Sequence, residues 1–133
     1  MTETAHKYWP NLDKRGTTAL EFGIILPVLL LFLLGIIDIG RLLWTYSTLY
    51  HACESAARCA AVNTVACGTT AQIQSNAAAQ SWGMTVAPAT FSVSNPSCGV
   101  QVAASYSFRF NTPGFGSITL APSACFTSLL ASS

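Results

Sequence analysis

An acidic side chain, Glu21, stands directly before an apolar run, Phe22 to Ile37, in which no residue is charged. A carboxylate next to hydrocarbon is costly, at about 2.5–3.5 kcal/mol on insertion scales for the centre of a bilayer, so such residues tend to have a function and a partner. The alternative is a glutamate at the level of the lipid headgroups, stabilised by the dipole of the helix that begins there. Glu21 is therefore the first candidate for a functional residue.

Two further charged residues, Asp38 and Arg41, lie directly after the uncharged apolar run. Residues three apart on a helix are neighbours, so the two side chains can form an ion pair. Because nothing else that titrates lies nearby, we interpret them as a local helix ion pair at the membrane interface and not as a proton relay.

Five cysteines, Cys53, Cys59, Cys67, Cys98 and Cys125, all follow the apolar run. An odd number leaves at least one unpaired or pairs it between subunits. Cys53 and Cys59 point in different directions from one predicted helix and cannot bridge each other. Cys59–Cys67 and Cys98–Cys125 are plausible disulfides, and Cys67–Cys98 is nearly as good, so the sequence does not choose.

The remaining polar residues predict neither catalysis nor a metal or cofactor site. His51 and Glu54 lie three apart on the predicted helix, which favours a solvated face over an acid–base pair. A zinc site needs closely spaced ligands such as CxxC, and only His51 and Cys53 come near that spacing. We therefore expect a protein that is not an enzyme.

Composition points to a membrane. Only 8% of the 133 residues are charged and 51% are hydrophobic, with a mean hydropathy of +0.46, whereas soluble domains carry about 25% charged residues. A net charge of +1 without a basic cluster excludes a nucleic-acid partner. The length suits one small domain and one membrane segment.

A helix over Phe22–Trp44 would be about 34 Å long, enough to cross a hydrocarbon layer of about 30 Å. Lys7, Lys14 and Arg15 precede it, and this excess of cations favours a cytoplasmic N-terminus and an outer C-terminal domain. Pro27 lies inside the run; membrane helices tolerate proline, so we expect a kink or local loosening there.

The helical pattern continues beyond the membrane to about Val62, from a start near Leu20. One face carries residues at spacings of four and three, Leu42, Tyr46, Leu49, Cys53, Ala56 and Ala60. The opposite face carries Thr45, Ser47, Glu54 and Arg58. The sequence therefore predicts one long helix, half in lipid and half outside.

A second, short helix and a small sheet follow. Thr69 and Gln72 form a capping-box pattern before an alanine-rich run to Ser81. Apolar and polar residues then alternate at 91–93 and over 100–110, the latter predicted as one strand, and 118–120 begins a returning strand after a turn. We expect an antiparallel sheet with one face packed on the outer half of the long helix.

The text Gly16-Thr-Thr-Ala-Leu-Glu21-Phe22 places a glutamate fifth after a glycine and directly before the apolar span. It resembles the type IV prepilin signal, which a membrane aspartyl peptidase cuts after the glycine. The wider segment is similar to the TadE-like family, pilin-like proteins of the tight-adherence (Tad) pilus. Its sequence is RGTTALEFGIILPVLLLFLLGIIDIGRLL. The similar block runs from about Lys14 to about Ala61, and weaker similarity extends to VQVAASYSFRF and ITLAPSACF.

This resemblance implies an α+β, pilin-like fold with three parts: a cytoplasmic leader (1–16), a transmembrane and assembly helix (17–44) and a periplasmic domain (45–133). Gly16 would be the last leader residue and Thr17 the new N-terminus. The assembly residues would be Glu21, Phe22 and Pro27. When helices stack with an axial offset, the Thr17 amine of one subunit can neutralise Glu21 of the next.

The function implied is that of a minor pilin or pseudopilin, because major subunits in the family are much shorter. Its partners would be a prepilin peptidase, other pilin subunits, the inner-membrane pilus platform and membrane lipid. It would span the inner membrane once and pass into a pilus that supports adherence. The alternative is an uncleaved bitopic membrane protein whose outer domain binds a partner.

Overall fold

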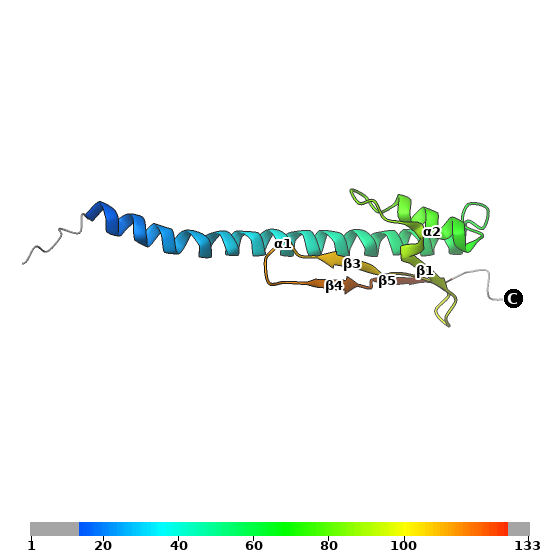
Figure 1. Cartoon of the computed structure of the whole chain (residues 1–133). Helices are drawn as coiled ribbons and strands as arrows, with labels where there is room; N and C mark the ends of the chain where they lie inside the picture. The colour runs from blue at the N-terminus through cyan, green and yellow to red at the C-terminus, as the bar shows by residue number, and fades with distance from the viewer. Residues whose placement is uncertain (1–13, 128–133) are drawn as a thin grey trace, which may run out of the picture.

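The computed structural model describes residues 14–127, which form a long helix, a short helix and two small antiparallel sheets (Figure 1). The predicted α+β class with a long N-terminal helix is confirmed. Most of the predicted leader, including Lys7, lies outside the described residues, as do the side chains of Lys14 and Arg15. The outer domain lies along one half of the long helix, and the other half is bare (Figure 1).

Helix α1 runs without interruption over Lys14–Val62, 49 residues. It ends where predicted and begins about two turns earlier than the expected start near Leu20. Pro27 lies inside it, and the helix curves gently over its first turns (Figure 1). Side chains from Gly16 to Leu34 are exposed, whereas from Asp38 onward one face is progressively covered.

The covered face of α1 is built mostly from small side chains. Its fully buried residues are Leu49, Ala52, Cys53, Ala56 and Ala57. Small residues let the second helix, α2 (Thr70–Ala79), and two strands, β2 (Val100–Ala104) and β5 (Ser123–Phe126), approach α1 closely, and all three pack on it. The predicted face was wrong in two places, because Tyr46 is exposed and Thr45 is buried. The physical reason is that the covered stripe runs through Leu42, Thr45, Leu49, Ala52 and Ala56, at spacings of three and four, which leaves Tyr46 beside the stripe and exposed.

Helix α2, Thr70–Ala79, begins with the predicted capping box. The Gln72 N–H donates to Thr69 Oγ1 over 3.3 Å, and the Thr69 N–H donates to Gln72 Oε1 over 3.1 Å. These two bonds satisfy backbone donors that have no partner within the helix. The helix buries Ile73 and Ala77.

Five strands follow the short 3₁₀ turn η1 (Pro88–Thr90): β1 (Phe91–Ser94), β2 (Val100–Ala104), β3 (Tyr106–Arg109), β4 (Ser117–Leu120) and β5 (Ser123–Phe126). One sheet has the order β1-β2-β5, and β3 pairs with β4 in the other. All pairings are antiparallel. The even-numbered face of β2 and β3 points to the core, where Val102, Ala104 and Phe108 are buried.

The single strand predicted over 100–110 is wrong, because it breaks at Ser105. The two halves nevertheless share one register, with Val100 opposite Phe126 and Arg109 opposite Ser117. In this register Pro122, which has no N–H to donate to a ladder, lies opposite Ala104, the residue before the break. Pro122 still accepts a bond from the Ala104 N–H over 2.9 Å, and the next N–H, that of Ser105, turns to Thr90 O over 2.9 Å.

Two disulfides close the outer domain. Cys59 is bonded to Cys67 across the turn after α1, and Cys98 is bonded to Cys125 between the β1–β2 connection and β5. These are two of the pairings that the sequence left open. Cys53 is the free cysteine among the described residues, and it is buried.

Candidate assembly site

The bare half of α1 presents an apolar surface that a folded monomer leaves uncovered. Its exposed side chains include Phe22, Ile24, Val28, Phe32 and Ile36. Among the described residues, α1 is the one helix long and apolar enough to cross a membrane. An apolar surface of this extent needs lipid or other helices to cover it. The N-terminal half of α1 is therefore a single-pass membrane anchor.

The residues assigned to processing and assembly lie at the start of this surface. Gly16 and Thr17 are in the first turns of α1, and both residues are exposed. Glu21 is also exposed, one turn farther along. Residues four apart share a helix face, so Thr17 and Glu21 lie on the same side, about 6 Å apart along the axis. Phe22 and Pro27 continue the apolar surface on the following turns.

Asp38 is buried, with only 2% of its surface exposed, at the point where the outer domain first meets α1. Its Oδ1 accepts a bond from Arg41 Nη1 over 3.1 Å, the ion pair expected on the helix. Its Oδ2 accepts three more bonds: from the Asn111 N–H over 2.9 Å, the Thr112 N–H over 2.8 Å and Thr112 Oγ1 over 2.7 Å. Asp38 therefore joins the β3–β4 loop to the helix.

Sequence reasoning did not find this role for Asp38. It assigned the carboxylate to its neighbour on the helix, because spacing reveals partners three or four residues away. The loop donors are more than seventy residues distant in the chain. The available signal was weak: Asn111 and Thr112 precede Pro113 in a turn, where backbone N–H groups often need a side-chain acceptor.

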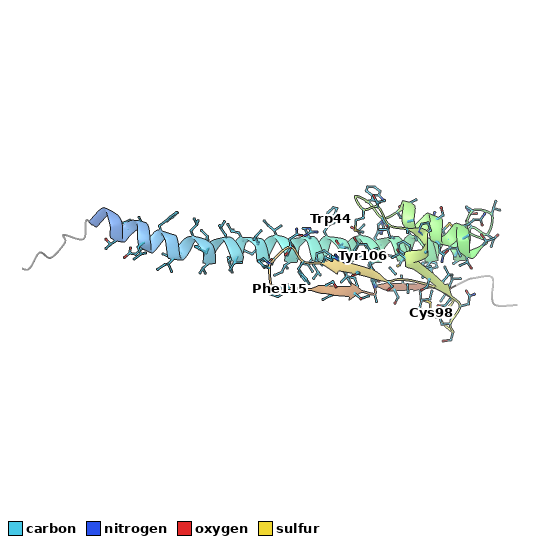
Figure 2. The ribbon with its side chains drawn as sticks, viewed as in Figure 1. Trp44, Cys98, Tyr106 and Phe115 are labelled. Carbon is cyan, nitrogen blue, oxygen red and sulfur yellow. A yellow bond between two sulfur atoms is a disulfide. The ribbon has the colours of Figure 1, made fainter. Side chains whose placement is uncertain are left out.

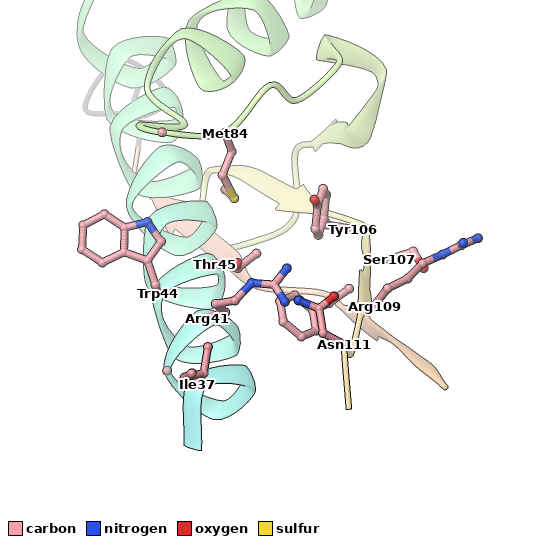
Figure 3. Close-up of a pocket in the computed structure, with 12 residues that line it drawn as sticks. Ile37, Arg41, Trp44, Thr45, Met84, Tyr106, Ser107, Arg109 and Asn111 are labelled. Carbon is pink, nitrogen blue, oxygen red and sulfur yellow. The ribbon is translucent and has the colours of Figure 1, made fainter. Parts of the chain in front are cut away.

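Arg41 lies in a groove of about 750 Å³ between α1, β3 and the chain around Met84 (Figure 3). Its guanidinium carbon is 5.4 Å from the centre of the Phe108 ring, a cation–π contact. Arg109 points away from Arg41, and the Trp44 ring lies on the other side of α1 (Figure 3). The two arginines therefore do not converge on one ligand. The contacts of Arg41 in this groove hold the outer domain against the helix, and the groove does not have the arrangement of a reaction site.

The thiol of Cys53 is enclosed by the core. Its Sγ is 3.7 Å from Pro122 O, and burial raises the pKa of this thiol to about 11. A protonated, enclosed thiol is a poor nucleophile and a poor metal ligand. His51 and Glu54 lie exposed on α1, and no group of three or more potential metal ligands occurs within residues 14–127.

Comparison with known proteins supports the resemblance seen in the sequence. The family model described as TadE-like protein matches residues 16–58, which confirms that resemblance. The match begins at Gly16, covers the apolar helix and the pair Asp38–Arg41, and ends before the second helix. No curated protein and no solved structure gave a significant match.

Proposed function

Since residues 16–58 form a TadE-like segment and α1 is a membrane anchor, we propose that this chain is a minor pilin or pseudopilin of a Tad-type pilus. The TadE-like family is associated with pilus components. The observation that carries the proposal is the coincidence of the family match with the bare half of α1: the matched segment contains both the prepilin-like glycine and the uncovered apolar surface.

The proposed pathway starts with the N-terminus in the cytoplasm and the domain 45–133 in the periplasm. A prepilin peptidase cuts after Gly16, and residues 17–44 remain as the transmembrane and assembly helix. The bond to be cut lies near the end of α1. Helix ends fray, so this turn can open to enter the peptidase.

The processed helix then assembles through its apolar surface. In a bundle of neighbouring helices the exposed Glu21 becomes enclosed, and an enclosed carboxylate needs a partner. The new Thr17 amine of the adjacent subunit supplies one when the two helices are offset along their axes. Pairing these two charges sets the axial register of the subunits, and the pilus platform and other pilins provide the neighbours.

The cleavage step is tested by co-expressing the full chain with an active or an inactive prepilin peptidase and measuring the intact mass. We expect Thr17 to become the N-terminus only with the active enzyme. Gly16→Leu should block this, and Gly23→Leu is a matched control, because an added side chain meets no atom within 4 Å at either glycine. An intact leader beside an active peptidase would favour the uncleaved bitopic protein instead.

A further inference from the structure

The β3–β4 loop, residues 110–116, is the part of the outer domain that lies nearest to the bare half of α1 (Figure 2). Together with the helix it lines an apolar groove of about 470 Å³. Pro113 and Phe115 form the loop side of this groove, and Phe32, Gly35 and Ile36 are among the residues on the helix side. The loop therefore lies beside the membrane anchor itself.

The tip of this loop is apolar, whereas Asn111 at its base is exposed and polar. Phe115 is 66% exposed, about as much as Phe32 on the membrane anchor at 67%. No residue after Arg109 is charged. Gly114 has φ +91, a conformation that other residues rarely adopt, and it forms the turn that carries Phe115. An exposed aromatic tip without nearby charge is unusual for a loop that faces water.

Four backbone N–H groups of the loop have partners within the protein. The N–H groups of Asn111 and Thr112 donate to Asp38, the Phe110 N–H donates to Gly116 O, and the Phe115 N–H donates to Thr112 O. Non-helical backbone can lie at membrane depth only if its polar groups are satisfied by protein or water. Asp38, whose charge is balanced by Arg41, accepts the bonds from the N–H groups of Asn111 and Thr112.

Distances along the helix give the level of the loop. Asp38 is about 24 Å beyond Phe22 at 1.5 Å per residue, and a hydrocarbon layer is about 30 Å thick. A layer that begins at Phe22 therefore ends near Leu42, past Asp38. A layer that begins at Thr17 ends near Ile37, next to Gly35 and Ile36, which line the groove together with Phe115. In the first position the tip lies about 9 Å inside the outer edge of the hydrocarbon, and in the second it lies at that edge.

We propose that the β3–β4 loop is a lipid-binding element whose Phe115 enters the outer leaflet, and that acyl chains fill the groove between this loop and α1. The inference requires that α1 crosses a membrane and is independent of processing or pilus assembly. Lipid is the occupant that fits, because the groove continues directly into the exposed surface of the anchor. Phe32 and Phe115 both line this groove, so a molecule that fills it contacts both rings.

Tryptophan fluorescence tests the proposal on the full chain in phosphatidylcholine vesicles. The three native tryptophans are replaced by phenylalanine, and single tryptophans are introduced as Phe115→Trp, Phe32→Trp and Val65→Trp. Phe32 marks the anchor, and Val65, in the turn after α1, is 88% exposed and marks the far end of the domain. Dibromo-phosphatidylcholine measures contact with acyl chains, and acrylamide measures contact with water.

We expect brominated lipid to quench F115W at least half as strongly as F32W, and several times more strongly than V65W. Acrylamide should quench V65W most. The proposal is overturned if F115W behaves like V65W, which places the loop in water, or if F115W is shielded from both quenchers, which indicates a protein neighbour. Loss of lipid quenching at F32W would also overturn it, by removing the membrane anchor on which it depends.

Discussion

One carboxylate fastens the membrane-proximal end of the outer domain to the helix. Asp38 accepts bonds from two backbone N–H groups, one hydroxyl and one guanidinium. Hydrogen bonds to a charged acceptor are roughly twice as strong as neutral ones. Removing the acceptor would leave the enclosed Thr112 donors without partners. The free-energy cost of burying these unsatisfied donors is larger than the net contribution of the hydrogen bonds to stability.

We therefore expect Asp38→Ala to lower the thermal midpoint of the outer domain by roughly 5–15 °C, measured by circular dichroism on the full chain in detergent. Thr112→Val removes only the hydroxyl and should have a smaller effect in the same direction. Glu54→Gln is the control, because Glu54 is an exposed acid on the same helix and should change the midpoint little. Equal midpoints for Asp38→Ala and the Glu54 control would contradict the role given to Asp38.

Cys53 shows how burial controls reactivity. Since its pKa is raised to about 11, only about one thiol in a thousand is ionised at pH 8. We expect iodoacetamide to leave Cys53 unmodified in the native protein at pH 8 and to modify it once the protein is unfolded with its disulfides intact. The native rate should rise about tenfold per pH unit toward pH 11, because a raised pKa delays formation of the thiolate. Mass spectrometry of the alkylated peptide measures this, and rapid labelling of the folded protein at pH 8 would refute it.

At the scale of the elements, the two disulfides constrain loops of different length. The sequence separations are 8 for Cys59–Cys67 and 27 for Cys98–Cys125. Gly99, next to Cys98, has φ +122, and a side chain there would collide with the Phe126 carbonyl. The second disulfide therefore joins a tightly packed connection to β5.

Loop-closure entropy predicts that the longer loop gains more from its bond, with about 3.5 kcal/mol for Cys98–Cys125 and about 2.5 kcal/mol for Cys59–Cys67. The double variant Cys98→Ser/Cys125→Ser should thus lose more stability toward urea than Cys59→Ser/Cys67→Ser. Peptide mapping without reduction verifies the pairings first. The reverse order of stability would show that packing around α1, not loop length, decides the effect.

The elements could be predicted from the sequence where local chemistry defines them. Thr69 and Gln72 cap α2 through bonds three residues apart, and alternation over 91–110 gives the inward faces of the strands. The break at Ser105 could not be predicted locally, because Pro122, to which we attribute it, lies in the distant segment between β4 and β5. The Asp38 contact escaped prediction for the same reason. Both predictions failed because a single sequence does not reveal which distant segments of the chain come into contact.

At the scale of the whole molecule, an exposed apolar helix and a compact outer domain separate two tasks. In the proposed assembly, insertion depends on the long apolar surface, whereas the axial register of the subunits depends on one charge at its end, Glu21. We expect Glu21→Gln to insert into the inner membrane normally, because it makes the helix no more polar. It should be depleted at least tenfold from sheared pili, as judged by immunoblot. Glu54→Gln should be incorporated normally, and normal incorporation of both variants would contradict a register role for Glu21.

The continuity of α1 also has a mechanical consequence. Its 49 residues make a rod about 74 Å long, and the Asp38 contact clamps the domain onto this rod near its middle. A tilt of about 10° at the lipid end would swing the opposite tip by about 13 Å. A lateral force on the domain would therefore act as a torque on the membrane-embedded turns, and we expect α1 to bend first at Pro27, which lacks the N–H of one helical hydrogen bond.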